Sequence, residues 1–144
     1  MQPVNILLVE DNKGDIRLTQ EAVKESKLLI NLSVVMDGVE AIEFLRKNGK
    51  YKDEIRPDII LLDLNLPKMD GRQVLADIKN DPDLKLIPVV ILTTSRSEED
   101  LLKSYGLHAN CYINKPLEFE QFIQVVQKIE DFWLTIVRLP KLEK

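Results

Sequence analysis

Short apolar runs alternate with amphipathic segments along most of this chain, and this alternation restricts the fold more than any other feature. Several runs are rich in branched residues and end at polar or turn-forming residues, which is typical of strands buried on both faces. These runs are 4–9, 32–36, 59–62, 88–92 and 110–113. Strands that alternate with helices in this way predict an α/β domain with a parallel sheet.

Helical spacing of apolar residues predicts the intervening elements. A first helix is expected over about 13–27, and a second after Asp37, ending near Gly49. Ser97 and Asp100 have the spacing of a capping box and predict the start of another helix. A final apolar stripe runs from Phe119 to Ile136 and predicts the last helix.

Right-handed crossovers place helices on both faces of such a sheet, so we expect a doubly wound, (βα)5 arrangement. The natural strand order for five strands is the flavodoxin-like order 2-1-3-4-5. In that order the first, third, fourth and fifth strands are neighbours, and their polar ends converge on one edge. The residues at these ends are Glu10, Asp11, Asp63, Thr93 and Lys115.

Carboxylates that converge in this way repel one another unless a cation shares their charge, so the pattern predicts a divalent metal. Carboxylates, a carbonyl and waters are hard oxygen ligands that suit Mg²⁺. Zinc is disfavoured, because His108 is the only histidine and Cys111 the only cysteine. The single cysteine also excludes an intrachain disulfide and fits a reducing cytoplasm.

A carboxylate beside Mg²⁺ can attack a phosphoryl group and form an acyl phosphate. Asp63 is the candidate nucleophile, because it ends an apolar run and is followed at once by a Pro/Gly-rich loop. Lys115 would pair with the phosphoryl oxygens, and the Thr93 hydroxyl would donate a hydrogen bond to them. Each residue taken alone also has a purely structural explanation, since Asp63 could simply cap a turn.

Composition excludes some classes of protein. The chain of 144 residues has a net charge of -4 and no cluster of basic residues, so we expect no direct nucleic-acid binding. It has no apolar run of membrane-spanning length and no signal peptide, so we expect no membrane and a cytoplasmic location. We expect one domain over residues 1–130, followed by an extension of the last helix and a tail over 131–144.

The ordered motifs resemble the receiver domain of bacterial two-component response regulators over residues 4 to 130. They are LVEDN at 8–12, LDLNLP at 62–67, MDG at 69–71, Thr93, and the pair Lys115 and Pro116. This resemblance implies that a sensor histidine kinase phosphorylates Asp63. It also implies a stand-alone regulator, because no effector domain follows in the sequence.

The resemblance also implies particular roles for the residues around Asp63. Asp11, Asp63 and the Asn65 carbonyl would bind Mg²⁺, and Glu10 would act through water. The peptide bond between Lys115 and Pro116 is cis in this family.

On phosphorylation Thr93 would move toward the phosphoryl group, and Tyr112 would rotate inward behind it. Asn65 and Ser95 would set the lifetime of the phosphoryl group, with slow self-dephosphorylation. The output would be a change in protein-protein contacts.

The C-terminal residues are unusually apolar for a tail. Together with the first motif, they resemble the small regulators that partner bacterial and cyanobacterial phytochrome histidine kinases. We expect a homodimer interface formed by Phe132, Trp133, Ile136 and Leu139. The alternative is that these residues pack on their own domain.

Three other functions are alternatives to a receiver domain. A Mg²⁺-dependent phosphohydrolase of the haloacid-dehalogenase type also uses an aspartyl phosphate, but it places its nucleophile after the first strand. A flavin-binding domain would need a phosphate-binding loop where Glu10 and Asp11 stand. A dimeric adaptor that is not phosphorylated is the remaining alternative.

Overall fold

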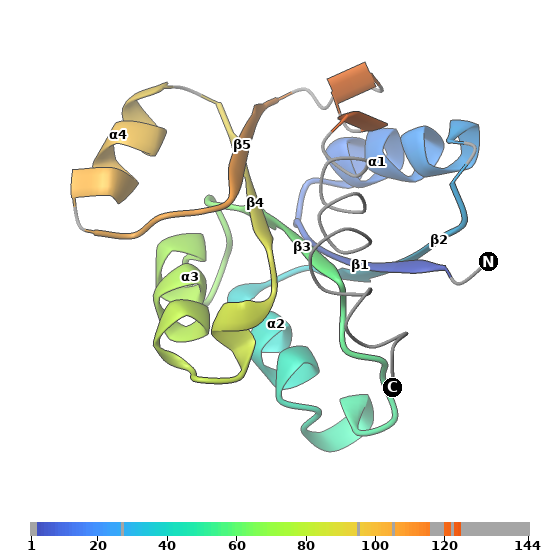
Figure 1. The fold of residues 1–144 in the computed structure, drawn as a ribbon, viewed down its shortest axis with the longest axis horizontal. Helices are drawn as coiled ribbons and strands as arrows, with labels where there is room; N and C mark the ends of the chain where they lie inside the picture. The colour runs from blue at the N-terminus through green and yellow to red at the C-terminus, as the bar shows by residue number, and fades with distance from the viewer. Residues whose placement is uncertain are drawn as a thin grey trace, which may run out of the picture.

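The computed structural model describes residues 3–26, 28–94, 96–104, 106–115, 120–121 and 123–124. Its described strands form one parallel sheet in the order β2-β1-β3-β4-β5 (Figure 1). The strands are β1 (Val4–Val9), β2 (Ile30–Val35), β3 (Ile59–Asp63), β4 (Val89–Thr93) and β5 (Cys111–Asn114). The predicted α/β class and strand order are therefore confirmed.

Helices connect successive strands and cover the sheet. They are α1 (Lys13–Glu25), α2 (Gly38–Leu45), α3 (Gly71–Asn80) and α4 (Arg96–Ser104), with short 3-10 helices at Gly49–Tyr51 and Leu84–Leu86. The predicted last helix and the tail fall almost entirely outside the described residues. Among the helices that the structure describes, none combines the length and apolarity needed to cross a membrane.

The two faces of the sheet pack against different helices (Figure 1). Leu7, Ile60 and Ile91 are buried in a cluster with residues of α2 and α3. Their strand neighbours Leu8 and Leu61 point to the opposite face, where a second cluster includes α1. Each of these side chains contributes about 1.5–3 kcal/mol by leaving water, so the sheet is the rigid base of the molecule.

The start of α4 corrects one prediction from the sequence. The helix begins at Arg96, so Ser97 lies inside its first turn and does not form a capping box with Asp100. The acid that folds back over this end of the helix is Glu98, whose carboxylate accepts hydrogen bonds from Thr94.

The end of α2 corrects a second prediction from the sequence. The helix ends at Leu45, before the expected stop near Gly49. Lys47 adopts the left-handed conformation with φ 57°, which turns the chain out of the helix although Lys47 is not a glycine. Gly49 also has a positive φ of 54°, but it belongs to the short 3-10 helix that follows.

Candidate functional site

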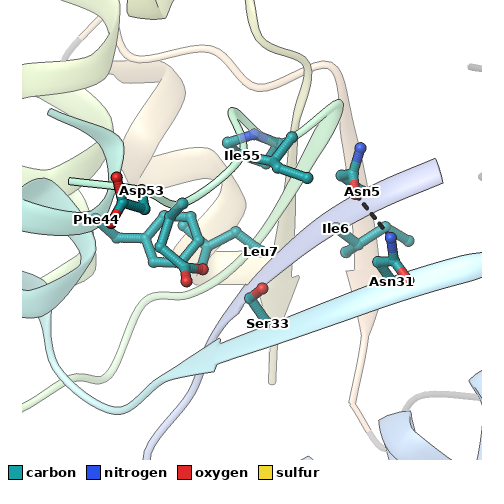
Figure 2. A pocket seen from close by; sticks show the side chains of 10 residues that line it. Asn5, Ile6, Leu7, Asn31, Ser33, Phe44, Asp53 and Ile55 are labelled. Carbon is teal, nitrogen blue, oxygen red and sulfur yellow. Dashed lines mark hydrogen bonds between the residues drawn. The ribbon is translucent and has the colours of Figure 1, made fainter. Parts of the chain in front are cut away.

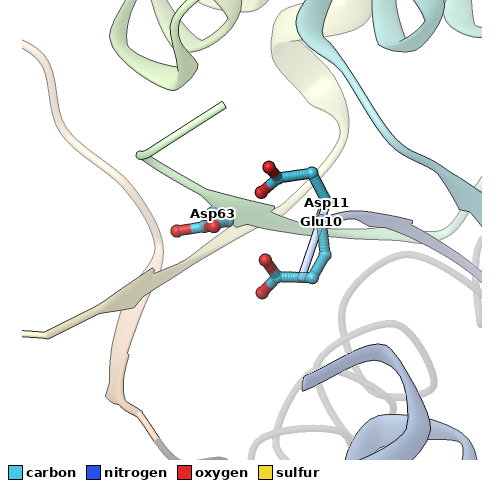
Figure 3. A group of neighbouring side chains, drawn as sticks. All are labelled: Glu10, Asp11 and Asp63. Carbon is cyan, nitrogen blue, oxygen red and sulfur yellow. The ribbon is translucent and has the colours of Figure 1, made fainter. Parts of the chain in front are cut away.

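Three carboxylates gather at the carboxyl edge of the sheet (Figure 3). Glu10 and Asp11 follow β1 directly, and Asp63 is the last residue of β3. One oxygen atom from each carboxylate lies within 4.8 Å of the others. Glu10 is 0% exposed and Asp63 is 3% exposed, whereas Asp11 is exposed. The structure thus brings together residues that are far apart in the sequence.

The register of the sheet accounts for this convergence. Val9 pairs with Leu62, so the ends of β1 and β3 are level. Because side chains alternate between faces, Glu10 and Asp63 continue the row that faces α1. Asp63 pairs with Leu92, which brings the end of β4 alongside as well.

A glycine allows the next helix to begin directly behind Asp63. A Cβ atom at Gly71 would overlap the carbonyl oxygen of Asp63 and lie 2.6 Å from the Leu64 Cα atom. The Gly71 backbone N–H also donates to the Leu64 carbonyl oxygen at 3.1 Å. The MDG motif therefore closes the loop after β3 tightly, with the Asp70 carboxylate accepting from the Arg72 N–H at 2.6 Å.

Lys115 provides a positive charge at the centre of the acidic group. Its Nζ atom lies 2.8 Å from Glu10 Oε1 and 3.2 Å from Asp63 Oδ2. Only 13% of its side chain is exposed. The Lys115 backbone N–H donates to the Thr93 carbonyl oxygen at 2.7 Å, which holds the lysine beside β4.

Asp15 is a member of the site that the motifs did not identify. Its carboxylate accepts a hydrogen bond of 2.9 Å from Lys115 Nζ. It lies in the first turn of α1, four residues after Asp11. The sequence holds no signal for this role, because an acid in the first turn of a helix is already explained by the helix dipole.

The surplus of negative charge changes the protonation of the buried groups. Burial, reinforced by Asp63, raises the pKa of Glu10 to about 7. Burial alone would lower the pKa of Lys115, but the close negative charges of Glu10 and Asp15 outweigh burial and raise that pKa above its usual value. Lys115 therefore stays charged, whereas Glu10 titrates near neutral pH.

The donor set fits a hard divalent cation. Glu10 Oε1 is buried and has no hydrogen-bond partner among the described residues, because its close contact with the Lys115 ammonium lacks hydrogen-bond geometry. Carboxylate oxygens are acceptors only, and one ammonium cannot neutralise several of them. Asn65, expected to add its carbonyl oxygen, follows in the loop, where its backbone N–H donates to Asp63 Oδ1 at 3.3 Å.

Thr93 and Tyr112 lie on the side of the sheet away from α1. Thr93 is 1% exposed and alternates with Leu92, which points toward α1. Tyr112 is partly buried against the α2 and α3 cluster, and its hydroxyl accepts from the Ala109 N–H at 3.4 Å. The two residues are thus placed on neighbouring strands, with Lys103 Nζ 5.3 Å from the Tyr112 ring centroid.

The remaining predicted site residues lie outside the described part of the chain. They are Ser95, Pro116, Phe132, Trp133, Ile136 and Leu139. The cis peptide, the second residue for tuning dephosphorylation and the dimer interface therefore stay predictions.

A pocket of about 260 Å³ opens near the amino ends of the strands (Figure 2). Its lining includes Asn5, Asn31, Phe44 and Ile55. The Asn31 amide donates to the Asn5 side-chain oxygen at 3.2 Å, so these polar groups satisfy each other. The pocket has no buried acidic group comparable with the one at the carboxyl edge.

Comparison with known proteins identifies the family. The model of the response regulator receiver domain matches residues 6–127. The chain belongs to the response regulator receiver family. Response regulator Rcp1 from Synechocystis sp. is 54% identical over 138 residues, which are 96% of this chain and 94% of Rcp1.

Solved receiver structures have the same fold. The phosphorylated cyanobacterial phytochrome response regulator RcpA is 55% identical, with a TM-score of 0.77 over 93% of this chain and 96% of RcpA. The Mn²⁺-bound form of Rcp1 has a TM-score of 0.75 and is 53% identical over 94% of this chain and 97% of that one. These matches select the response regulator interpretation over the phosphohydrolase and the flavin-binding domain. This receiver is a signalling domain of two-component systems.

Proposed function

We propose that Asp63 accepts a phosphoryl group from a sensor histidine kinase of the phytochrome type. The observation that carries this proposal is the position of Asp63 at the end of β3, 3% exposed and 3.2 Å from the Lys115 ammonium. An acidic residue buried among other acids and beside one cation does not stabilise the fold well, so its position is better explained by a chemical role. The similarity to RcpA, a phytochrome response regulator, supports this type of kinase.

Mg²⁺ is the proposed cofactor. Glu10, Asp11, Asp63 and the Asn65 carbonyl would hold it, directly or through water. The Mn²⁺-bound form of Rcp1 supports this proposal, because it shows that a similar receiver binds a divalent cation. When bound, the cation supplies positive charge that offsets the acidic residues and the phosphoryl oxygens.

The chemistry is phosphoryl transfer between two side chains. An oxygen of Asp63 forms a bond to phosphorus while the bond between phosphorus and the kinase histidine breaks. Lys115 would turn from its carboxylate partners toward a phosphoryl oxygen, and the Thr93 hydroxyl would donate to another. Water later attacks the same phosphorus, so slow self-dephosphorylation ends the signal, and the chain has no separate substrate to turn over.

The output is a change in contacts with other proteins. We propose that Thr93 and Tyr112 form the switch, since they lie on adjacent strands next to α4. Moving such a switch from mostly off to mostly on needs a bias of about 5.5 kcal/mol, which bonds to the new phosphoryl group can provide.

We also propose a cytoplasmic location and a homodimer whose interface is formed by residues 131–144, beyond the receiver domain proposed over 1–130. Sedimentation of the Trp133→Glu variant tests the dimer, because this variant should have the mass of a monomer. A variant that sediments like wild type would refute the interface.

Transfer from a purified phytochrome-type kinase tests the main proposal. The kinase is labelled with radioactive ATP and mixed with the receiver and Mg²⁺. Label should move to wild type and to Asp53→Asn, an exposed acid of the distant pocket, and not to Asp63→Asn. Excess EDTA added before mixing should stop the transfer. Label on Asp63→Asn, or transfer that EDTA does not affect, would contradict the proposal.

A further inference from the structure

Glu98 connects α4 to two loops at the proposed phosphorylation site. Its Oε1 atom accepts hydrogen bonds from the Thr94 N–H at 2.9 Å and from the Thr94 hydroxyl at 2.7 Å. Its Oε2 atom accepts from the Asn65 side-chain amide at 3.2 Å. Thr94 directly follows the end of β4, and Asn65 lies two residues beyond Asp63. One carboxylate thus links the loops after β3 and β4.

The contact with Asn65 is not explained by the start of the helix. An acid in the first turn of α4 satisfies nearby backbone donors, and the bonds from Thr94 do this. Asn65 lies 33 residues away and contributes nothing to the helix end. The second oxygen of Glu98 therefore has a different role, which is to hold the Asn65 side chain.

The chemistry of the two groups fixes how Asn65 is turned. A carboxylate can only accept, so the amide must present its NH2 group to Glu98 and turn its oxygen away. The backbone N–H of Asn65 donates to Asp63 Oδ1 at 3.3 Å, so the residue lies next to the acceptor carboxylate. The amide oxygen is then the group of Asn65 that can accept a hydrogen bond from a water molecule.

We propose that Glu98 is a positioning residue for hydrolysis of the phosphoryl group on Asp63. It holds Asn65 so that the amide oxygen accepts a hydrogen bond from the attacking water. The water oxygen bonds to phosphorus, and the bond between phosphorus and the Asp63 oxygen breaks. Inorganic phosphate leaves with the protons of the attacking water, and the Asp63 carboxylate is restored. The inference rests on the proposed function and names a residue that controls the duration of its signal.

The test is a double-mutant cycle on the rate of dephosphorylation. Each protein is loaded with acetyl phosphate and Mg²⁺, freed of the donor, and followed by intact mass. Glu98→Ala should lose the phosphoryl group about three- to tenfold more slowly than wild type, the factor expected for one lost hydrogen bond. Asn65→Ala should be slowed similarly, and the double variant no more than either single variant.

Two control variants separate positioning from helix capping. Glu99→Ala removes a neighbouring acid that pairs with Lys103 at 3.0 Å on the same helix, and it should decay like wild type. Thr94→Val removes one bond to Glu98 but keeps Asn65 in place, so it should also decay like wild type. If Glu98→Ala does not fold, Glu98→Gln, which can still accept one of these bonds, should give an intermediate rate.

Three results would overturn the inference while leaving the proposed function intact. The first is dephosphorylation of Glu98→Ala at the wild-type rate. The second is a double variant whose slowing is the product of the two single effects. The third is slowing of Thr94→Val equal to that of Glu98→Ala. Failure of the wild type to gain a phosphoryl group would instead refute the proposed function and the inference with it.

Discussion

The two ends of the sheet carry similar polar residues in opposite environments. At the amino end Asp58 accepts a 2.8 Å hydrogen bond from the Asn5 backbone N–H, and Asn31 donates to the Asn5 side chain. Asp58 and Asn31 are exposed. At the carboxyl end Glu10 and Asp63 are buried.

This difference in burial shows which polar residues at strand ends indicate a functional site. The amino-end groups satisfy one another or meet water, so they stabilise the fold modestly and need nothing else. In the part of the chain that the structure describes, the carboxyl-end acids outnumber the single ammonium of Lys115, and an unsatisfied buried oxygen remains on Glu10. Burial combined with unbalanced charge, and not the presence of acids alone, marks the site.

Removal of Lys115 should have the largest effect on stability. Lys115→Ala leaves buried carboxylates without a positive partner, so we expect about 3–5 kcal/mol less free energy of unfolding at pH 8 without divalent cations. The measurement is urea denaturation. The control is Lys103→Ala, which breaks the partly exposed pair with Glu99 and should change stability by less than about 1 kcal/mol. Equal losses in the two variants would contradict the comparison.

The pH dependence of stability should follow Glu10. Its pKa is raised from 4.5 to about 7 in the folded state, so the native protein binds a proton more tightly than the unfolded chain. Without divalent cations, stability should therefore fall as pH rises from about 4.5 to 7 and stay low above that. Glu10→Gln should remove this fall in urea titrations across the pH range, whereas Glu99→Gln should keep it. A fall that persists in Glu10→Gln would assign the titration elsewhere.

Gly71 tests how tightly the loop behind Asp63 is closed. A Cβ at this position meets backbone atoms that cannot move aside, so Gly71→Ala should lose about 2 kcal/mol of stability. Gly14→Ala is the matched control, because its Cβ would lie 3.2 Å from a side-chain atom of Asn12. It should change the free energy of unfolding by less than about 1 kcal/mol. A larger loss of stability in Gly14→Ala than in Gly71→Ala would show that the loop behind Asp63 is not the more tightly packed of the two positions.

The smallest effect is expected at the amino end. Asp58→Asn keeps an acceptor for the Asn5 N–H in an exposed position, so stability should change by less than about 1 kcal/mol. Phosphorylation should be unchanged. A loss comparable with that of Lys115→Ala would mean that the two ends are not distinguished by burial.

Much of the molecule was predictable from local patterns. The strand order and the polar ends of β1, β3, β4 and β5 follow from the alternation of apolar runs and from the rules for parallel sheets. The end of α2 did not follow, because Lys47 adopts a left-handed conformation that sequence statistics assign to glycine.

The roles of Asp15 and Glu98 were also missed, for a different reason. Each has an ordinary explanation as an acid in the first turn of a helix. Their partners Lys115 and Asn65 come from distant parts of the chain, and only the folded structure brings them together.

The central claim is that Asp63 is the phosphoacceptor. The most direct measurement is the intact mass of the protein after incubation with acetyl phosphate and Mg²⁺, followed by peptide mapping. Wild type and Asp58→Asn should each gain one phosphoryl group, located on Asp63, and Asp63→Asn should gain none. An unmodified wild type, or an Asp63→Asn variant modified to the same extent, would contradict the account.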